Sequence, residues 1–191
     1  TQMIAKGFDF DNVSLVGIID ADSMLNYPDF RSHERAFQLL SQVSGRAGRK
    51  EKQGKVVLQT YNPDHEILDY VKKHSFSKFY NLQISERKTF NYPPFSKLLI
   101  VRFRHTDHYV LDKVTNMFST FLRDSFNDRV LGPEYPVISK VKNYFIKNIM
   151  LKIEVNKSYA EAKNIVSLLL SHMKSNKLLE GCVVQIDVDP N

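Results

Sequence analysis

The sequence of 191 residues holds a single cysteine, Cys182, which excludes an internal disulfide framework and any zinc site built from several cysteines. A lone cysteine also fits a reducing compartment, so we expect a cytoplasmic protein. Apolar runs are short, and the run at residues 165–170 falls far below the roughly 20 residues that span a bilayer. The start, at Thr1, shows neither the basic nor the apolar region of a signal peptide and no initiator Met. We therefore expect a piece of a longer protein with no membrane partner.

Hydrophobic residues make up 42% of the chain and charged residues 25%, which predicts a folded protein with a core and argues against disorder. Basic residues outnumber acidic ones by 27 to 21, giving a formal net charge of +6 that leans toward the second half of the chain. Such an excess is compatible with a polyanion partner but is not diagnostic of one.

The beginning of the chain alternates strand and helix signals, which is the pattern of a sheet whose strands are joined through helices. Residues 14–19 form a compact apolar run typical of a buried parallel strand, and polar residues, Asp20 and Asp22, follow it. The other elements expected here are a short extended segment at residues 1–4, a helix at 32–44 and a strand at 55–60. We interpret residues 1–62 as part of an α/β unit.

Residues 63–90 are expected to form a helical connector. Residues 62–64 (Asn-Pro-Asp) are predicted to cap a helix whose apolar face carries Ile67 and Val71, and a second helix is expected at residues 77–88.

The paired prolines Pro93 and Pro94 mark a boundary, because they stop a helix and hold an extended linker. Beyond them, residues 91–191 show the order β-α-β-β-α-β, which predicts a ferredoxin-like α+β domain. The expected strands are residues 97–104, 137–141, 144–155 and 183–188, and the expected helices are residues 107–126 and a segment opened by a Ser158–Glu161 capping box.

The stretch with the most chemical information is residues 42–49, Gln-Val-Ser-Gly-Arg-Ala-Gly-Arg, in which a glycine precedes each of two arginines. Glycine permits close backbone approach, and the guanidinium group offers a rigid set of donors suited to phosphate oxygens. Arginine placed in this way stabilises charge on a transferred γ-phosphoryl group. The alternative is a solvated helix C-terminus, where the helix dipole favours arginine. The residues alone leave both interpretations open.

The spacing QxxGRxGR resembles motif VI of superfamily 2 helicases, and TQMIAKGFDF at the start resembles motif V of the same enzymes. The stretches DFRSHERAFQLLSQVSGRAGR and GKVVLQTYNPDH are similar to the PriA family of replication-restart helicases, and so are ISERKTFNYPPF, LGPEYPVISKVKNYF and VVQIDVDP. The resemblance covers essentially the whole chain. It implies an α/β plus α+β fold, with the C-terminal half of a RecA-like helicase lobe followed by a DNA-binding ferredoxin-like domain at residues 91–191.

For motif V, the resemblance implies that Thr1 lies near a nucleic-acid phosphate and that Asp9 approaches the nucleotide ribose, with Gly7 allowing the turn between them.

For motif VI, the resemblance places Gln42 and Gly45 in the ATP site and implies that Arg46 and Arg49 reach the γ-phosphate across the cleft between two lobes. Arg49 is the stronger candidate for the arginine finger.

Several motifs of the family are missing from the chain. It has no GxxxxGK[ST] loop to cradle phosphates, no DExx run to hold Mg²⁺ and none of the eight zinc-binding cysteines expected of the family. We therefore expect ATP, Mg²⁺ and zinc to serve the full-length protein, with the Mg²⁺ and zinc ligands outside this chain. The chain alone is expected not to hydrolyse ATP.

A second candidate site interleaves basic and aromatic residues at a predicted hairpin, with Lys140, Lys142 and Lys147 around Tyr144. Lysines of this kind contact phosphates while Tyr144 or Phe145 stacks on an unpaired base. The alternative is an exposed hairpin whose aromatic rings face the core. The family's C-terminal domain is associated with DNA binding, which favours the first interpretation.

The remaining polar residues of interest have competing explanations. Arg102 and Arg104 alternate on a strand and either extend the DNA-binding surface or protect a sheet edge. Asp20 and Asp22 are interpreted as loop-capping residues or as contacts to another lobe. The six histidines show no spacing typical of metal ligands, so no metal site is expected.

The sequence and its resemblance together predict the C-terminal part of an ATP-dependent 3′-to-5′ DNA helicase that restarts replication at stalled forks by primosome assembly. Forked and single-stranded DNA, single-strand DNA-binding protein and other primosome proteins are the expected partners. Two alternatives stay open: another superfamily 2 fork-remodelling translocase, and a non-enzymatic DNA-binding module with a vestigial helicase lobe.

Overall fold

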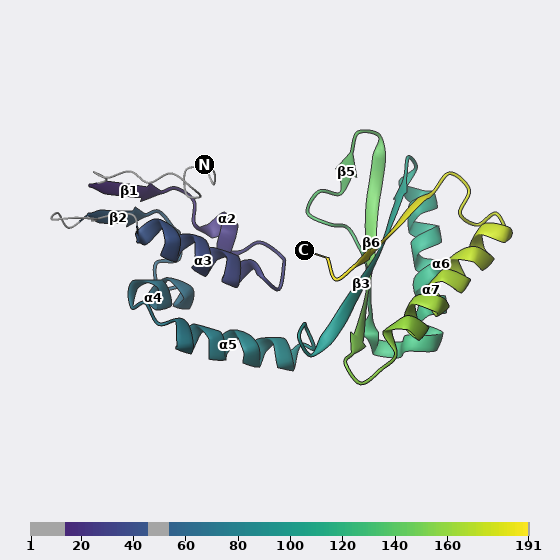
Figure 1. Cartoon of the computed structure of the whole chain (residues 1–191). Helices are drawn as coiled ribbons and strands as arrows, with labels where there is room; N and C mark the ends of the chain where they lie inside the picture. Colours follow the sequence, from purple (N-terminus) through teal and green to yellow (C-terminus); the bar gives the residue numbers. More distant parts are fainter. Residues whose placement is uncertain (1–13, 46–53, 191) are drawn as a thin grey trace. The chain divides into compact units, whose positions relative to one another are not determined.

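The computed structural model describes residues 14–45 and 54–190. It divides the chain into two compact units, one up to Glu86 and one from Arg87 onward, and each is considered by itself (Figure 1). Within the described residues, every helix is too short or too polar to cross a bilayer.

The first unit is built around two parallel strands. Strand β1 pairs with β2, and the register places Leu15 opposite Lys55 and Ile18 opposite Leu58. A parallel pair requires a crossover, which α3 provides between the two strands. The elements are β1 (Leu15–Ile18), α2 (Asp22–Leu25), α3 (Ser32–Ser44), β2 (Lys55–Leu58) and α4 (Glu66–Lys72). The strands expected at residues 14–19 and 55–60 and the helix expected at residues 32–44 are present, and both strands are shorter than predicted. The extended segment expected at residues 1–4 lies outside the described residues.

The core of the first unit lies between α2, α3 and α4, and α5 (Phe76–Thr89) adds one ring to it. Phe37 on α3 stacks on Phe79 of α5 with ring centroids 4.3 Å apart. The buried apolar side chains of this core are Ala21, Leu25, Ala36, Phe37, Leu40, Ile67, Leu68, Val71 and Phe79.

The predicted start of α4 is wrong. Residues 62–64 precede the helix in a turn in which the backbone N–H of His65 donates to the Asn62 carbonyl oxygen. His65 caps the helix instead, because its ring Nδ1 accepts a hydrogen bond from the Ile67 N–H at 3.3 Å. A histidine cap is unusual, since Ser, Thr, Asp and Asn are the preferred capping residues.

The second unit is a mixed α/β unit with an antiparallel sheet in the order β4-β6-β3-β7, and β5 pairs with β6 beside this path. Strands β3 and β6 form the longest ladder, from Ser96 opposite Glu154 to His105 opposite Phe145. Helices α6 and α7 cover one side of the sheet (Figure 1). The elements are β3 (Ser96–His105), α6 (His108–Phe126), a 3₁₀ turn (Asn127–Arg129), β4 (Val130–Glu134), β5 (Lys140–Val141), β6 (Tyr144–Glu154), α7 (Tyr159–Ser175) and β7 (Val183–Val188).

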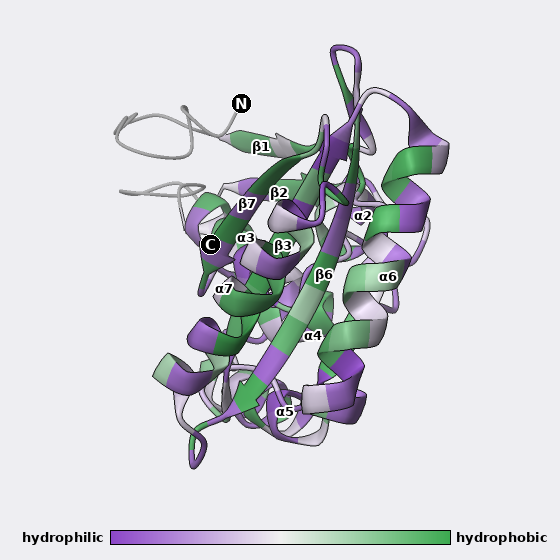
Figure 2. Cartoon of the chain, turned by 90° about the vertical axis from the view of Figure 1, so that its right-hand side faces the viewer, coloured by the Kyte–Doolittle hydropathy of each residue, from purple (hydrophilic) through white to green (hydrophobic). Residues whose placement is uncertain are grey.

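The core of the second unit lies between the helices and the sheet, and it collects alternate strand residues. Leu99, Val101 and Phe103 on β3 share this side with Ile149 and Leu151 on β6. Because successive strand residues point to opposite faces, the even-numbered positions of both strands face away from the helices. The helices are amphipathic to match, with hydrophobic and hydrophilic segments alternating around α6 and α7 (Figure 2).

The prediction for the strand before β6 needs correction. We expected a strand at residues 137–141, but only Lys140–Val141 is extended there, and the sheet takes Val130–Glu134 as β4 instead. Gly132 and Pro133 argue against a strand at β4 when the sequence alone is considered, since both residue types are depleted in strands. The ladder with β6 shifts register between Leu131 and Glu134, which is how the strand accommodates them.

Both helices of the second unit start at side-chain caps. Asp107 accepts hydrogen bonds from the backbone N–H groups of Tyr109 at 2.8 Å and Val110 at 3.4 Å. Ser158 accepts from the Glu161 N–H at 3.2 Å, as the capping signal predicts.

Candidate functional site

Five predicted site residues of the first unit lie outside the described residues, namely Thr1, Gly7, Asp9, Arg46 and Arg49. The two others, Gln42 and Gly45, lie at the end of α3. Gly45 is the C-terminal cap, and its N–H donates to the Ser41 carbonyl oxygen at 3.0 Å. The helix therefore ends immediately before the arginine pair of the motif.

Gln42 borders a pocket of about 470 Å³ formed by α2 and α3 and by the segment between them. Its lining residues include Tyr27, Arg35, Gln38 and Gln42, together with apolar residues of α2 and α3. Arg35 is held by Asp29, with 3.0 Å between Nη1 and Oδ2. Among the described lining residues, an aromatic residue, two amide residues and an arginine form a set compatible with the base and ribose of a nucleotide.

Asp22 joins the segments that follow β1 and β2. Its carboxylate accepts from the Tyr61 N–H at 2.9 Å and from the Thr60 hydroxyl at 2.8 Å. These two hydrogen bonds lower the pKa of Asp22. Asp20 accepts from the Ser23 N–H at 3.1 Å. Asp20 therefore caps its own loop, whereas Asp22 binds the loop that follows β2.

Within residues 14–45 and 54–190, no three His, Cys, Asp or Glu side chains are grouped in a way that could hold a metal ion.

The second predicted site is the hairpin formed by β5 and the start of β6. Lys140 pairs with Phe145 and Val141 with Tyr144, so Lys142 and Asn143 form the turn. Lys142 has a positive φ of 53°, and its side chain is exposed. The ammonium of Lys140 lies 4.4 Å from the centre of the Phe145 ring.

Three of the predicted DNA-binding residues, Lys140, Lys142 and Tyr144, therefore gather at this hairpin, and Tyr144 is 39% exposed. The loop that carries β5 stands on the side of the sheet away from α6 and α7 (Figure 1). We call this the hairpin tip.

Lys147 does not belong to the hairpin tip. Its side chain is only 10% exposed, and its ammonium lies 2.6 Å from an Asp112 carboxylate oxygen. The strand alternation explains the difference, since Lys147 is in phase with Ile149 and Leu151, which face the helices.

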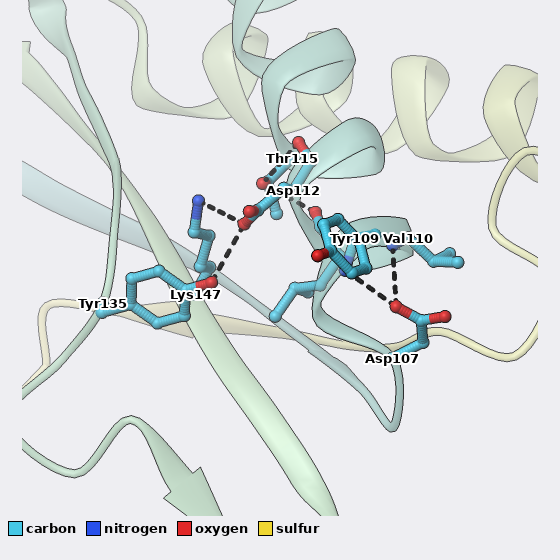
Figure 3. A network of polar contacts seen from close by, with 8 residues as sticks. Asp107, Tyr109, Val110, Asp112, Thr115, Tyr135 and Lys147 are labelled. Atoms are coloured by element: carbon cyan, nitrogen blue, oxygen red, sulfur yellow. Dashed lines mark hydrogen bonds and ion pairs between the residues drawn. The ribbon is translucent and has the colours of Figure 1, made fainter.

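Asp112, Tyr135 and Lys147 form a polar cluster that we call the clamp (Figure 3). The Tyr135 hydroxyl donates to Asp112 at 3.0 Å, and the Lys147 ammonium lies 4.6 Å from the centre of the Tyr135 ring. The hydrogen bond from Lys147 lowers the pKa of Asp112, and burial raises the pKa of Tyr135, so Tyr135 stays a hydrogen-bond donor at neutral pH. The clamp connects α6 and β6 to the start of the loop that leads to the hairpin tip.

The clamp gives a testable pH dependence. The folded-state pKa of Asp112 lies below its ordinary value of 3.8, so the carboxylate stabilises the folded protein at neutral pH. That stabilisation is lost as the pH falls through the lowered pKa. We expect Asp112→Asn to reduce the free energy of unfolding at pH 7 by about 1 kcal/mol, a modest value because solvent screens a carboxylate that is 39% exposed.

Urea unfolding at pH 7 and at pH 3 measures this effect, and the difference between wild type and variant should shrink at the lower pH. Asp124→Asn on the exposed side of α6 is the control and should change stability at neither pH. Equal losses in the two variants at pH 7 would contradict the role of the clamp.

Arg102 and Arg104 lie on β3, which is an inner strand of the sheet, so the prediction of edge protection is wrong. Arg102 Nε donates to the Asn148 amide oxygen at 3.3 Å, and Arg104 Nη2 donates to the Gln185 amide oxygen at 3.0 Å.

Sequence reasoning missed both partners of Lys147. The alternation of β6 could have placed Lys147 on the helix side, but nothing in the sequence near Asp112 or Tyr135 points to the lysine. The sequence also did not indicate that the amides of Asn148 and Gln185 accept hydrogen bonds from Arg102 and Arg104, since these contacts depend on the pairing of three strands.

Comparison with known proteins identifies relatives of the chain. Residues 88–191, more than half of it, match the family described as primosomal protein N C-terminal domain. The whole chain is 36% identical to replication restart protein PriA of Bacillus subtilis (strain 168), of which it covers 24%. The proteins of the same name from Synechocystis and Treponema pallidum are 34% and 33% identical over the whole chain, which covers 22% and 28% of them. The chain thus spans about a quarter of the length of the curated relatives it matches.

Proposed function

Because the chain belongs to the PriA family, of whose members it matches the C-terminal part, we propose that it is the C-terminal part of an ATP-dependent 3′-to-5′ DNA helicase that restarts replication at stalled forks. The observation that carries this proposal is the similarity of the whole chain to proteins named for replication restart. Primosome assembly, single-strand DNA-binding protein and other primosome proteins are part of the same proposal.

In this proposal, the first unit is the second half of a RecA-like lobe, and it contributes Arg46 and Arg49 to an ATP site. Two features support it: the parallel pairing of β1 and β2 through a helical crossover, and the end of α3 at Gly45 directly before the arginines. The pocket beside Gln42 would take the base and ribose. ATP supplies the phosphoryl group when bound, the two arginines stabilise negative charge at the γ-phosphate, and groups outside this chain hold Mg²⁺ and zinc.

The second unit is, in this proposal, a ferredoxin-like domain that binds forked and single-stranded DNA. The β-α-β-β-α-β order of its main elements and the antiparallel sheet β4-β6-β3-β7 support that fold. The hairpin tip supports DNA binding, because two exposed ammonium groups flank a half-exposed aromatic ring. Ammonium groups contact phosphates and the ring stacks on an unpaired base.

Fluorescence anisotropy of the chain with labelled forked, single-stranded and duplex DNA at two salt concentrations tests the role of the hairpin tip. Lys140→Gln/Lys142→Gln should weaken single-strand binding and reduce the slope of log K against log salt by about 1.4, which corresponds to two lost phosphate contacts. Tyr144→Ala should cost about 1–3 kcal/mol of binding free energy if one base stacks on the ring.

Lys113→Gln/Lys174→Gln removes the same charge from exposed positions of α6 and α7 and serves as the control. If the wild-type chain binds none of the three DNAs at low salt, the proposal that this part of the protein binds DNA is wrong. If it binds and the hairpin and control variants weaken binding equally, the hairpin tip is not the binding site.

A further inference from the structure

The sheet of the second unit has one side that no described helix of this unit covers, although Leu98 and Ile146 on that side are buried. Helices α6 and α7 cover the other side (Figure 1). Strand alternation points the even-numbered residues of β3 and β6 away from these helices. We call this uncovered side the open face. Its centre is polar: Arg102 lies opposite Asn148 on β6 and opposite Gln185 on β7.

The two arginines of the open face are held by neutral groups. Arg102 bonds to the Asn148 amide and Arg104 to the Gln185 amide, at 3.3 and 3.0 Å. Among the described residues, neither arginine pairs with a carboxylate, and Arg104 Nε is buried without a hydrogen-bond partner. The amides therefore hold the guanidinium groups without neutralising them. Asp187 and Glu134 share this face, opposite Ile100 and Asn148, but neither of these described carboxylates forms an ion pair with the arginines.

Two positive charges that lack an ion-pair partner and lie side by side on an inner strand repel each other, and this cost is relieved when an anion lies across them. Residues two apart on one face are about 7 Å apart along a strand, so one anion cannot neutralise both at close range but a chain of linked anions can.

An aromatic ring continues the same face. Tyr144 is an even-numbered residue of β6, in phase with Asn148, and it lies beyond Ile146, which is opposite Arg104. A row of guanidinium groups leading to a half-exposed ring is the combination used to bind single strands, where cations follow the backbone and a ring stacks on a base.

We propose that the open face binds a single DNA strand, with Arg102 and Arg104 contacting successive backbone phosphates and the strand running along β3 toward Tyr144. This inference rests on the proposed function, which places forked and single-stranded DNA at this unit, and adds the surface and the path of the strand across it. An acidic peptide would satisfy the two charges but would make no use of the ring, so DNA is the occupant that the whole face favours.

Anisotropy with a fluorescein-labelled oligothymidylate and the full 191-residue chain tests the inference. Arg102→Gln/Arg104→Gln should weaken binding at least tenfold and reduce the salt slope by about 1.4. Arg102→Lys/Arg104→Lys keeps both charges but loses the geometry of the guanidinium groups. This variant should keep most of the slope of log K against log salt. The control is again Lys113→Gln/Lys174→Gln, which removes two charges from the helices behind the sheet and should weaken binding less than the arginine pair does. Circular dichroism with an unchanged thermal midpoint shows that each variant is folded.

The outcomes separate this inference from the function on which it rests. A wild-type chain that binds no DNA overturns the proposed function. If the wild-type chain binds oligothymidylate and the Arg102→Gln/Arg104→Gln variant binds like the control, only the inference about the open face is overturned. Polyglutamate that competes as strongly as unlabelled oligothymidylate also overturns it, in favour of an acidic peptide.

Discussion

Replacing Arg49 by alanine in the full-length protein is expected to lower the rate of ATP hydrolysis about a thousandfold, the lower end of the range for loss of an arginine finger. The reason is electrostatic. A guanidinium that reaches the γ-phosphate stabilises charge in the transition state, and little of that charge is present in bound ATP. The apparent affinity for ATP should therefore change much less than kcat.

Steady-state ATPase assays with saturating single-stranded DNA measure this loss, and anisotropy with the same DNA shows whether the variant is intact. Lys50→Ala removes the neighbouring charge and is the matched control. Its kcat should change by less than about threefold, which corresponds to well under the roughly 1.4 kcal/mol of activation free energy that a tenfold change in rate requires. Arg49→Lys should restore little activity, because an ammonium cannot reproduce the planar pair of donors. An Arg49→Ala variant as active as Lys50→Ala would exclude Arg49 as the arginine finger.

The largest expected effect on stability is in the core of the second unit. Phe118 on α6 is fully buried and packs edge-to-face on Phe103 of β3, with ring centroids 5.1 Å apart. Phe118→Ala should cost about 3–5 kcal/mol, because the lost apolar contacts and the remaining cavity both destabilise the folded state. That is a large part of the stability of an ordinary domain.

Urea unfolding followed by circular dichroism is the suitable measurement, since the chain has no tryptophan to report on its core. Tyr109→Ala is the matched control, because this ring lies on the same helix and is 74% exposed; it should change stability by less than about 0.5 kcal/mol. A loss below about 1 kcal/mol for Phe118→Ala would mean that α6 does not pack on the sheet as described.

Local periodicity predicted most of the elements. The apolar run before Asp20 and the helical stripe around Leu40 correspond to β1 and α3, and Ser158 opens α7 as its spacing with Glu161 predicts. These elements depend on interactions within a few residues, which is the information a single sequence carries.

The misplaced elements and residues depend on contacts between distant segments. Strand β4 contains Gly132 and Pro133 and is extended because β6 offers it a ladder, which the local sequence does not indicate. Lys147 was predicted to bind DNA together with Lys140 and Lys142, whereas the clamp holds it toward α6. For the ATP site, the evidence at Arg46 and Arg49 is the motif itself, since both residues lie outside the described ones.

The pairing of β3 with β7 has a consequence for synthesis on the ribosome. Leu98 and Asp189 are joined by a hydrogen bond of 3.1 Å although they are 91 positions apart in the chain. At translation rates of about 5–20 residues per second, β3 leaves the ribosome roughly 5–20 seconds before β7 can pair with it. During that interval one side of β3 offers unpaired backbone groups to any other nascent chain. The second unit therefore completes its sheet late, and slow translation of residues 106–182 would prolong its exposure to misassembly.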